Sequence, residues 1–190
     1  MIKYILIFIG TFTICNSIQS QENLNLSIDL HEFGKIKWDS LINQNIDTII
    51  ELYSGNHSGD YLVTENSDTC ICKGNNIFRF YIWEIGTKKY IQKISCCKIH
   101  TAKLLTSNNL FVFLNKNLKT LENEEYKTNS VVASSFIQIK YKFGKNEGIK
   151  YFDNYMINKK YEPENWKINK KLKSHKILKK MLKKAEKVWK

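Results

Sequence analysis

A run of β-branched and aromatic residues in the middle of the chain constrains the fold more than any other feature. Residues 77–85 read IFRFYIWEI, a composition typical of strands. Residues 86–88 (Gly-Thr-Lys) suit a tight turn, and residues 90–94 return as a second strand. The sequence therefore predicts a β-hairpin in which position 77 lies opposite position 97.

Hydrophobic spacing predicts further elements in the N-terminal half. Alternation over residues 24–30 favours a half-buried strand, and residues 61–64 suit a short one. Apolar residues at spacings of three and four predict an amphipathic helix over 38–53. This helix would start near Asp39 or Ser40 and end before Gly55.

Elements of the C-terminal half complete the predicted fold class. A Ser-Asn-Asn sequence at 107–109 can cap a helix carrying Leu110, Phe111, Leu114, Leu118 and Leu121. Residues 136–143 predict a strand that buries its odd-numbered positions, and residues 149–156 return after a turn. We expect an α+β domain of antiparallel hairpins, with two or three helices packed on one face of the sheet.

The first 20 residues have the pattern of a secretory signal peptide. Lys3 is followed by an apolar stretch too short to cross a bilayer, and then by small and polar residues. We expect cleavage after Ser20 and export to the periplasm or the extracellular space. Lipid attachment at Cys15 is an alternative, although Ile14 stands where such sites have a small residue.

Composition limits the class of protein. One proline among 190 residues and a hydrophobic content of 43% exclude low-complexity and disordered chains. We expect a single domain over 21–158 and a C-terminal extension over 159–190. The preference for lysine, asparagine and isoleucine resembles the vocabulary of AT-rich bacterial genomes, so lysine richness alone is weak evidence for any partner.

Four cysteines remain after the signal peptide: Cys70, Cys72, Cys96 and Cys97. An even number of cysteines in an exported chain favours disulfides. In the predicted hairpin, Cys96 and Cys97 lie level with the start of the first strand, and Cys70 and Cys72 lie just upstream of that strand. One bridge or two, unpaired packing cysteines, and a copper(I) or zinc site are the alternatives. The spacing is not that of a zinc knuckle, so we expect neither a metal nor a cofactor.

Catalytic motifs are scarce. The segment 54–60 combines glycines with His57, Ser58 and Asp60, which are weak candidates for a small secreted hydrolase. The same composition describes an ordinary turn. His31-Glu32 begins like a zincin motif, but Lys35 replaces its second histidine.

Two further groups have a structural and a functional interpretation. Phe78, Phe80, Tyr81 and Trp83 predict core packing, with a sugar or partner platform at Tyr81 and Trp83 as the alternative. Glu122, Glu124 and Glu125 predict a solvated helix end.

The charge is concentrated at the C-terminus. Residues 159–190 carry 13 lysines and three acids, whereas residues 1–158 are almost neutral. From Ile168 to Trp189 apolar residues recur at spacings of three and four, and Pro163 suits a first helical turn. The opposite side collects the lysines expected to contact an anionic surface: Lys173, Lys176, Lys180, Lys183, Lys184 and Lys187.

These observations predict an exported bacterial binding or envelope-associated module without catalytic activity. The basic helix would dock on the domain, or bind an anionic membrane surface, an acidic protein or a polysaccharide. Nucleic acid is disfavoured because the export signal separates the protein from it. The alternatives are a hydrolase using the His57 loop and a membrane-active effector that acts through the C-terminal helix.

Overall fold

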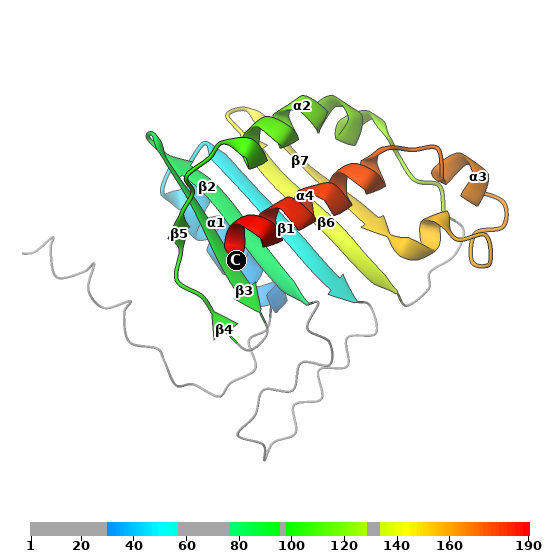
Figure 1. Cartoon of the computed structure of the whole chain (residues 1–190), viewed down its shortest axis with the longest axis horizontal. Helices are drawn as coiled ribbons and strands as arrows, with labels where there is room; N and C mark the ends of the chain where they lie inside the picture. Colours follow the sequence, from blue (N-terminus) through cyan, green and yellow to red (C-terminus); the bar gives the residue numbers. More distant parts are fainter. Residues whose placement is uncertain (1–29, 57–76, 96–97, 129–133) are drawn as a thin grey trace, which may run out of the picture.

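The computed structural model describes residues 30–56, 77–95, 98–128 and 134–190. They form an α+β fold with a seven-stranded antiparallel sheet in the order β4-β3-β2-β1-β6-β7, in which β5 also pairs with β3 (Figure 1). The strands are β1 (Thr48–Asn56), β2 (Phe78–Ile85), β3 (Lys88–Ser95), β4 (Lys98–Ile99), β5 (Lys103–Leu104), β6 (Ser135–Phe143) and β7 (Asn146–Asp153). The helices are α1 (Leu30–Asn43), α2 (Asn109–Asn123), the 3-10 turn η1 (Asn154–Ile157), α3 (Trp166–Asn169) and α4 (Ser174–Trp189). The predicted fold class is confirmed.

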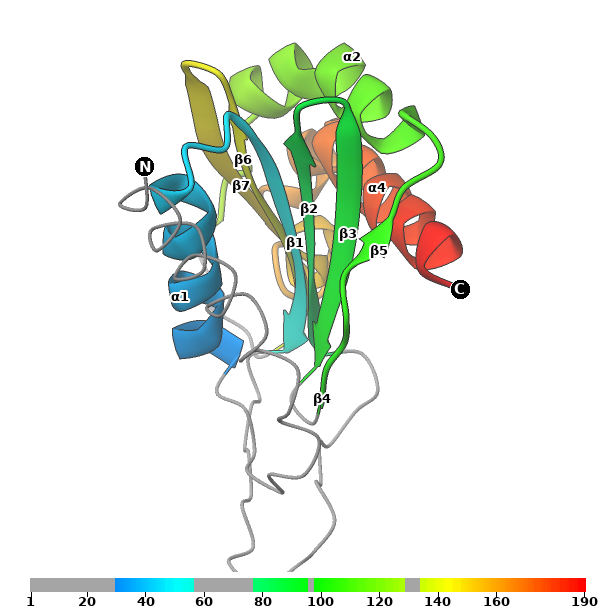
Figure 2. The same cartoon turned by 90° about the vertical axis from the view of Figure 1, so that its left-hand side faces the viewer.

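Helices cover both faces of the sheet. Figure 2 shows α1 on one side and both α2 and α4 on the other. The prediction that all helices share one face is wrong, because the central strands are apolar on both faces. Ile49 and Ile50 are neighbours in β1 and point to opposite faces, yet both are fully buried. Each face of the sheet is therefore stable only when helices pack against it.

The predicted hairpin over residues 77–94 is confirmed as β2 and β3. Gly86 occupies the turn with a φ of 58°, a conformation that glycine adopts without steric cost. The register pairs Phe78 with Ser95, which differs by one residue from the predicted alignment.

The predicted helix over residues 38–53 is confirmed over 38–43 and wrong beyond that point. Helix α1 ends at Asn43, the chain turns through Asn45 at a φ of 56°, and β1 follows as a central strand. Apolar spacings of three and four also arise where a helix is followed by a strand that is buried on both faces. Leu30 begins α1 rather than ending a strand, and the rest of the predicted strand over 24–30 lies outside the described residues, as does the one over 61–64.

The predicted helix after residue 109 and the hairpin after residue 136 are confirmed as α2 and as β6 with β7. The five predicted apolar residues of α2 are all buried. Asn108 is the N-cap, although its side chain makes no capping hydrogen bond. Ile137, Ile139 and Tyr141 of β6 are buried on one face as predicted, and Phe143 is half-buried beside them.

The C-terminal region is not one long helix. Turns and the four-residue α3 precede α4, and Pro163 lies in those turns, ahead of α3. At the end of α3 lies Asn169, whose fully buried side-chain amide donates to the carbonyls of Lys127 and Met156. These bonds hold the end of α3 against the domain, and α4 begins five residues later.

Candidate functional site

Several predicted site residues lie outside the described part of the chain. They are His57, Ser58 and Asp60 of the hydrolase hypothesis, the cysteines 70, 72, 96 and 97, and the whole signal region with Cys15. The hydrolase, disulfide and lipid-attachment hypotheses therefore stay predictions.

The aromatic run of β2 belongs to the core. Phe78, Phe80, Tyr81 and Trp83 are each at most 6% exposed. Phe78 and Phe80 pack under α2 and α4, whereas Tyr81 and Trp83 pack under α1. The core interpretation is confirmed, and a binding platform at Tyr81 and Trp83 is wrong because α1 covers both rings.

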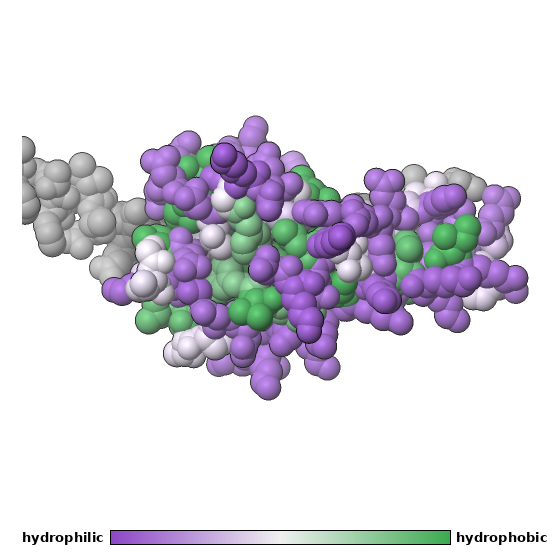
Figure 3. All heavy atoms as spheres, turned by 90° about the horizontal axis from the view of Figure 1, so that it is seen from above, coloured by the Kyte–Doolittle hydropathy of each residue, from purple (hydrophilic) through white to green (hydrophobic). Residues whose placement is uncertain are grey.

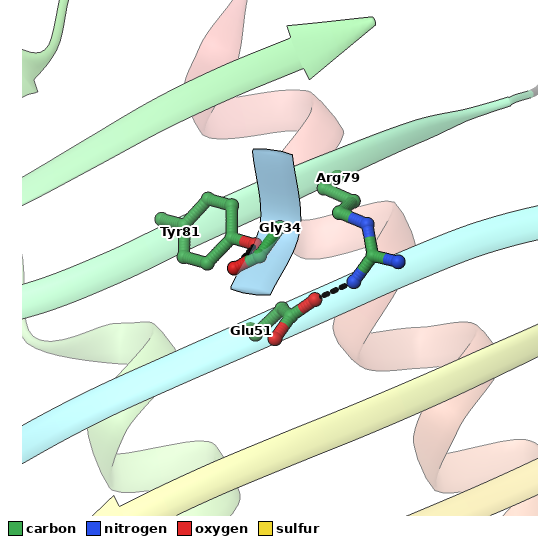
Figure 4. A network of polar contacts seen from close by, with 4 residues as sticks. All are labelled: Gly34, Glu51, Arg79 and Tyr81. Atoms are coloured by element: carbon green, nitrogen blue, oxygen red, sulfur yellow. Dashed lines mark hydrogen bonds and ion pairs between the residues drawn. The ribbon is translucent and has the colours of Figure 1, made fainter. Parts of the chain in front are cut away.

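A polar network lies beneath α1. Arg79 forms a buried ion pair with Glu51, and the Tyr81 hydroxyl donates to the Gly34 carbonyl at 3.0 Å (Figure 4). Arg79 also stacks on Tyr53, with its Cζ 3.8 Å from the ring centroid. Burial, followed by the charge of Glu51, raises the pKa of Tyr81. Glu51, Arg79 and Tyr81 are buried between α1 and the sheet, and the bond from Tyr81 ties α1 to β2.

A shallow hollow beside the C-terminal half of α1 offers no acid–base pair. Asp39 is the one ionisable residue that lines it, together with Ile36, Ser40, Asn43 and Gln44. General acid–base catalysis by a pair needs two positioned titratable groups, and this lining supplies one carboxylate.

The apolar stripe of α4 is part of the main core. Ile177, Leu178, Met181 and Ala185 are buried in the same cluster as the apolar faces of α2, β1, β2 and β6. Figure 1 shows α4 lying across the strands next to α2. The stripe is therefore occupied by the protein itself.

The opposite side of α4 presents a row of ammonium groups. Lys176, Lys180, Lys183 and Lys187 are exposed at intervals of three or four residues, and we call them the lysine row. At a rise of about 1.5 Å per residue, the row extends along roughly 16 Å of helix. Glu186 is the one acid in α4. The row is thus a straight strip of positive charge.

The other lysines of this helix flank the row. Lys184 is half-buried, and its ammonium lies 5.3 Å from the Phe113 ring, which Lys180 approaches from 5.5 Å. Lys173 is exposed just before the helix. Lys179, which sequence reasoning missed, is also exposed, and its ammonium lies 5.2 Å from the Phe152 ring. A helical wheel drawn for α4 alone places Lys179 on the polar side, so the sequence contained this signal.

Side chains from the end of α2 fix the start of α4. Glu124 Oε2 accepts hydrogen bonds from the backbone N–H groups of Lys173 and Ser174, both at 2.7 Å. The Glu122 carboxylate accepts from the Tyr141 hydroxyl at 3.1 Å, and burial followed by this contact raises the pKa of Tyr141 to about 12. The predicted solvated helix end is confirmed for Glu122 and Glu125, which are exposed, although Glu122 also contacts β6. Glu124 is half-buried and links the end of α2 to the start of α4.

His175 lies in the first turn of α4 and is buried. Its backbone N–H donates to the Tyr126 hydroxyl at 2.8 Å, and its Nδ1 lies 3.0 Å from the same oxygen. Burial is the main cause that lowers the pKa of His175, and Lys179 and Lys176 lower it further. A neutral imidazole therefore suits this position.

Positive charge also gathers at the other end of α4. Lys103 Nζ donates to the Trp189 carbonyl at 2.7 Å and lies 4.3 Å from the indole ring, while the His100 ring packs edge-on against that ring. Burial lowers the pKa of His100, and Lys98, Lys93 and Lys103 lower it further. This end therefore extends the basic surface of α4 onto the edge of the sheet.

Comparison of the chain with family models, with curated proteins and with solved structures finds no match. In the part of the chain that the structure describes, no helix has the length and apolar character needed to cross a membrane. The same residues contain no group of three or more histidine, cysteine or acidic side chains placed to hold a metal ion.

Proposed function

We propose that this chain is an exported, non-catalytic module that binds the anionic lipid surface of a bacterial envelope through the lysine row of α4. One observation carries the proposal: the apolar stripe of α4 is buried in the core while its lysines form an exposed row. The apolar side of this amphipathic helix thus contributes to the core, and its polar side presents the positive charge.

The burial of the apolar stripe favours one mode of binding. A free amphipathic helix sinks its apolar face into the headgroup region. Here that face is occupied, so insertion of α4 would require the main core to open. We therefore expect α4 to lie on the lipid surface by charge attraction and to remain folded on its domain.

The charge of the row is large enough for peripheral binding. Each lysine close to an anionic leaflet contributes about 1 kcal/mol, and the attraction decays over a Debye length of about 8 Å at physiological salt. Unbound, like charges at spacings of three and four repel each other by roughly 0.2–0.5 kcal/mol per pair. An anionic surface relieves this repulsion and adds attraction.

Export is the second part of the proposal, and the pattern of residues 1–20 supports it. Intact-mass spectrometry of the protein recovered from the periplasm or the medium tests it. We expect a chain that starts at Gln21. A diacylglycerol adduct on Cys15 would show instead that the exported protein is anchored by a lipid.

Vesicle co-sedimentation tests the binding function. We compare the wild type with the variant K176Q/K183Q/K187Q, which removes three exposed lysines of the row. Lys180 is retained because it also contacts Phe113. The matched control K35Q/K88Q/K145Q removes three exposed lysines, from α1, from the start of β3 and from the turn between β6 and β7.

We expect the wild type to bind equimolar phosphatidylglycerol–phosphatidylcholine vesicles and to leave pure phosphatidylcholine unbound. The row variant should bind roughly 100-fold more weakly, since three lysines contribute about 1 kcal/mol each. Equal binding by the row variant and the control would contradict the proposal. Binding to an acidic polysaccharide, with none to anionic vesicles, would assign the row to a different partner.

A further inference from the structure

The chain around α3 exposes apolar side chains among lysines. We call residues 159–171 the α3 tip. Ile168 is 49% exposed and Tyr161 38% exposed, and Trp166 is half-buried between them in sequence. Figure 3 shows hydrophobic residues (green) among hydrophilic ones (purple) at the end of the molecule where α3 lies in Figure 1. One exposed aliphatic side chain and two aromatic rings thus occur within eight residues of sequence, and a partner of this segment has to accept both kinds of group.

Ammonium groups lie against both aromatic rings of the tip. Lys170 Nζ is 5.4 Å and Lys159 Nζ 5.8 Å from the centre of the Trp166 ring. Lys160 Nζ is 5.5 Å from the centre of the Tyr161 ring. Such contacts hold the positive charges at the same level as the rings. The tip therefore presents apolar and cationic groups side by side.

Buried polar groups hold the tip in place from within. The Asn169 side chain accepts from the Lys127 N–H at 3.0 Å, in addition to its two donated bonds. Glu162 is 1% exposed, and its carboxylate accepts from the Thr128 hydroxyl and from the Asn165 amide. These bonds hold the tip against the domain, and Ile168 and Tyr161 are exposed at its surface.

The chemistry of the tip matches the boundary layer of an anionic bilayer. Tyrosine and tryptophan favour this layer because one end of each ring is apolar and the other can hydrogen-bond. Lysines beside them reach the lipid phosphates while their methylene stems stay in the apolar region. A sugar partner fits less well, because a sugar stacks on an open aromatic face and Trp166 has two ammonium groups against its ring.

We infer that the α3 tip is the point at which the protein penetrates an anionic lipid surface, with Ile168, Trp166 and Tyr161 entering the boundary between headgroups and acyl chains. The inference rests on the proposed function and adds how deeply the protein enters the lipid surface and which end of it enters. The lysine row begins at Lys176, five residues after the last residue of the tip, so the tip anchors the N-terminal end of the row.

Tryptophan quenching by brominated lipid tests penetration. Trp38 and Trp83 are buried and Trp189 lies at the other end of α4, which makes Trp166 the reporter of the tip. We expect weaker wild-type fluorescence on phosphatidylglycerol vesicles with brominated acyl chains than on unbrominated ones. The variant W166F should lose that difference and keep its binding within a few-fold.

A matched pair of substitutions tests the contribution of Ile168. I168D places a charge in the proposed anchor, and I36D places one at an isoleucine of α1 that is 57% exposed, against 49% for Ile168. I168D should weaken vesicle binding by roughly ten-fold or more, since burying one such side chain is favourable by about 1.5–3 kcal/mol. I36D should bind like the wild type, and thermal unfolding should show both variants folded.

The outcomes separate this inference from the proposed function. Salt-sensitive vesicle binding without quenching at Trp166, together with equal binding by I168D and I36D, would overturn the inference and leave the function standing. No binding to anionic vesicles by the wild type would overturn both.

Discussion

The two faces of the sheet are covered by different chemistry. The face under α2 and α4 is filled by aliphatic and aromatic side chains, including the stripe of α4. The face under α1 combines a smaller apolar cluster with the buried pair of Glu51 and Arg79. Hydrophobic packing tolerates some exchange of side chains, whereas a buried ion pair requires both partners in place. The comparison indicates that α4 supplies stability and that the α1 side specifies how its helix is seated.

The largest expected effect breaks the α1 side. Glu51→Ala removes the partner of a guanidinium that is only 5% exposed. Breaking a buried pair costs about 3–5 kcal/mol, because the remaining charge is left uncompensated. Urea unfolding followed by circular dichroism measures the loss of free energy.

The double variant Glu51→Leu/Arg79→Met is the control for this effect. It removes both charges while keeping side-chain volume, so we expect it to be much more stable than Glu51→Ala. A double variant as unstable as the single one would mean that packing at these positions, and not the unpaired charge, dominates the α1 side.

The next effect breaks the α4 side. Leu178 is fully buried, and Leu178→Ala should cost about 3 kcal/mol in the free energy of unfolding through lost burial and a cavity. Leu182→Ala, four residues later on a half-buried position, should cost roughly half of that or less. Equal, small losses for both would show that α4 contributes little to the core.

A smaller effect concerns the start of α4. Glu124→Ala removes the acceptor of two backbone N–H groups at the helix N-terminus and should cost about 1 kcal/mol. The neighbouring exposed Glu125 is the matched control, and its change to alanine should leave the midpoint of thermal unfolding nearly unchanged. Identical midpoints for the two variants would contradict the capping role.

The smallest expected effect is a pH dependence of stability on the α4 side of the sheet. His175 has a lowered pKa in the fold, so the unfolded chain takes up a proton first as the pH falls through its ordinary value of 6.5. Its contribution to stability is therefore complete above that pH and is lost as the pH falls toward the folded pKa. Unfolding midpoints from about pH 7.5 to about pH 5 should fall less for His175→Gln than for the wild type. Parallel curves for the two proteins would show that His175 does not couple α4 to pH.

Elements specified by local sequence could be predicted. The β2–β3 hairpin follows from β-branched residues around a glycine turn, and the lysine row follows from helical spacing alone. The helix predicted over 38–53 is wrong beyond residue 43 because the same spacing also fits a helix end followed by a strand buried on both faces. Asn45, at a positive φ, was the local sign of that boundary.

The polar contacts could not be predicted, because they depend on pairing between distant segments. Glu51 and Arg79 are 28 residues apart, and they meet only because β1 pairs with β2 in the register that sets Tyr53 opposite Arg79. The α3 tip was missed for a related reason. Helical spacing alone extends the predicted C-terminal helix back toward Pro163. In the structure that helix is interrupted near Asn169, which bonds to Lys127, 42 residues earlier.

The position of α4 in the chain has a consequence for folding during synthesis. Leu178, Met181 and Ala185 complete the main core, yet they come after every strand. A chain emerging from the ribosome therefore exposes the α4 side of its sheet until residues 174–189 appear, and we expect it to stay open to proteases until then.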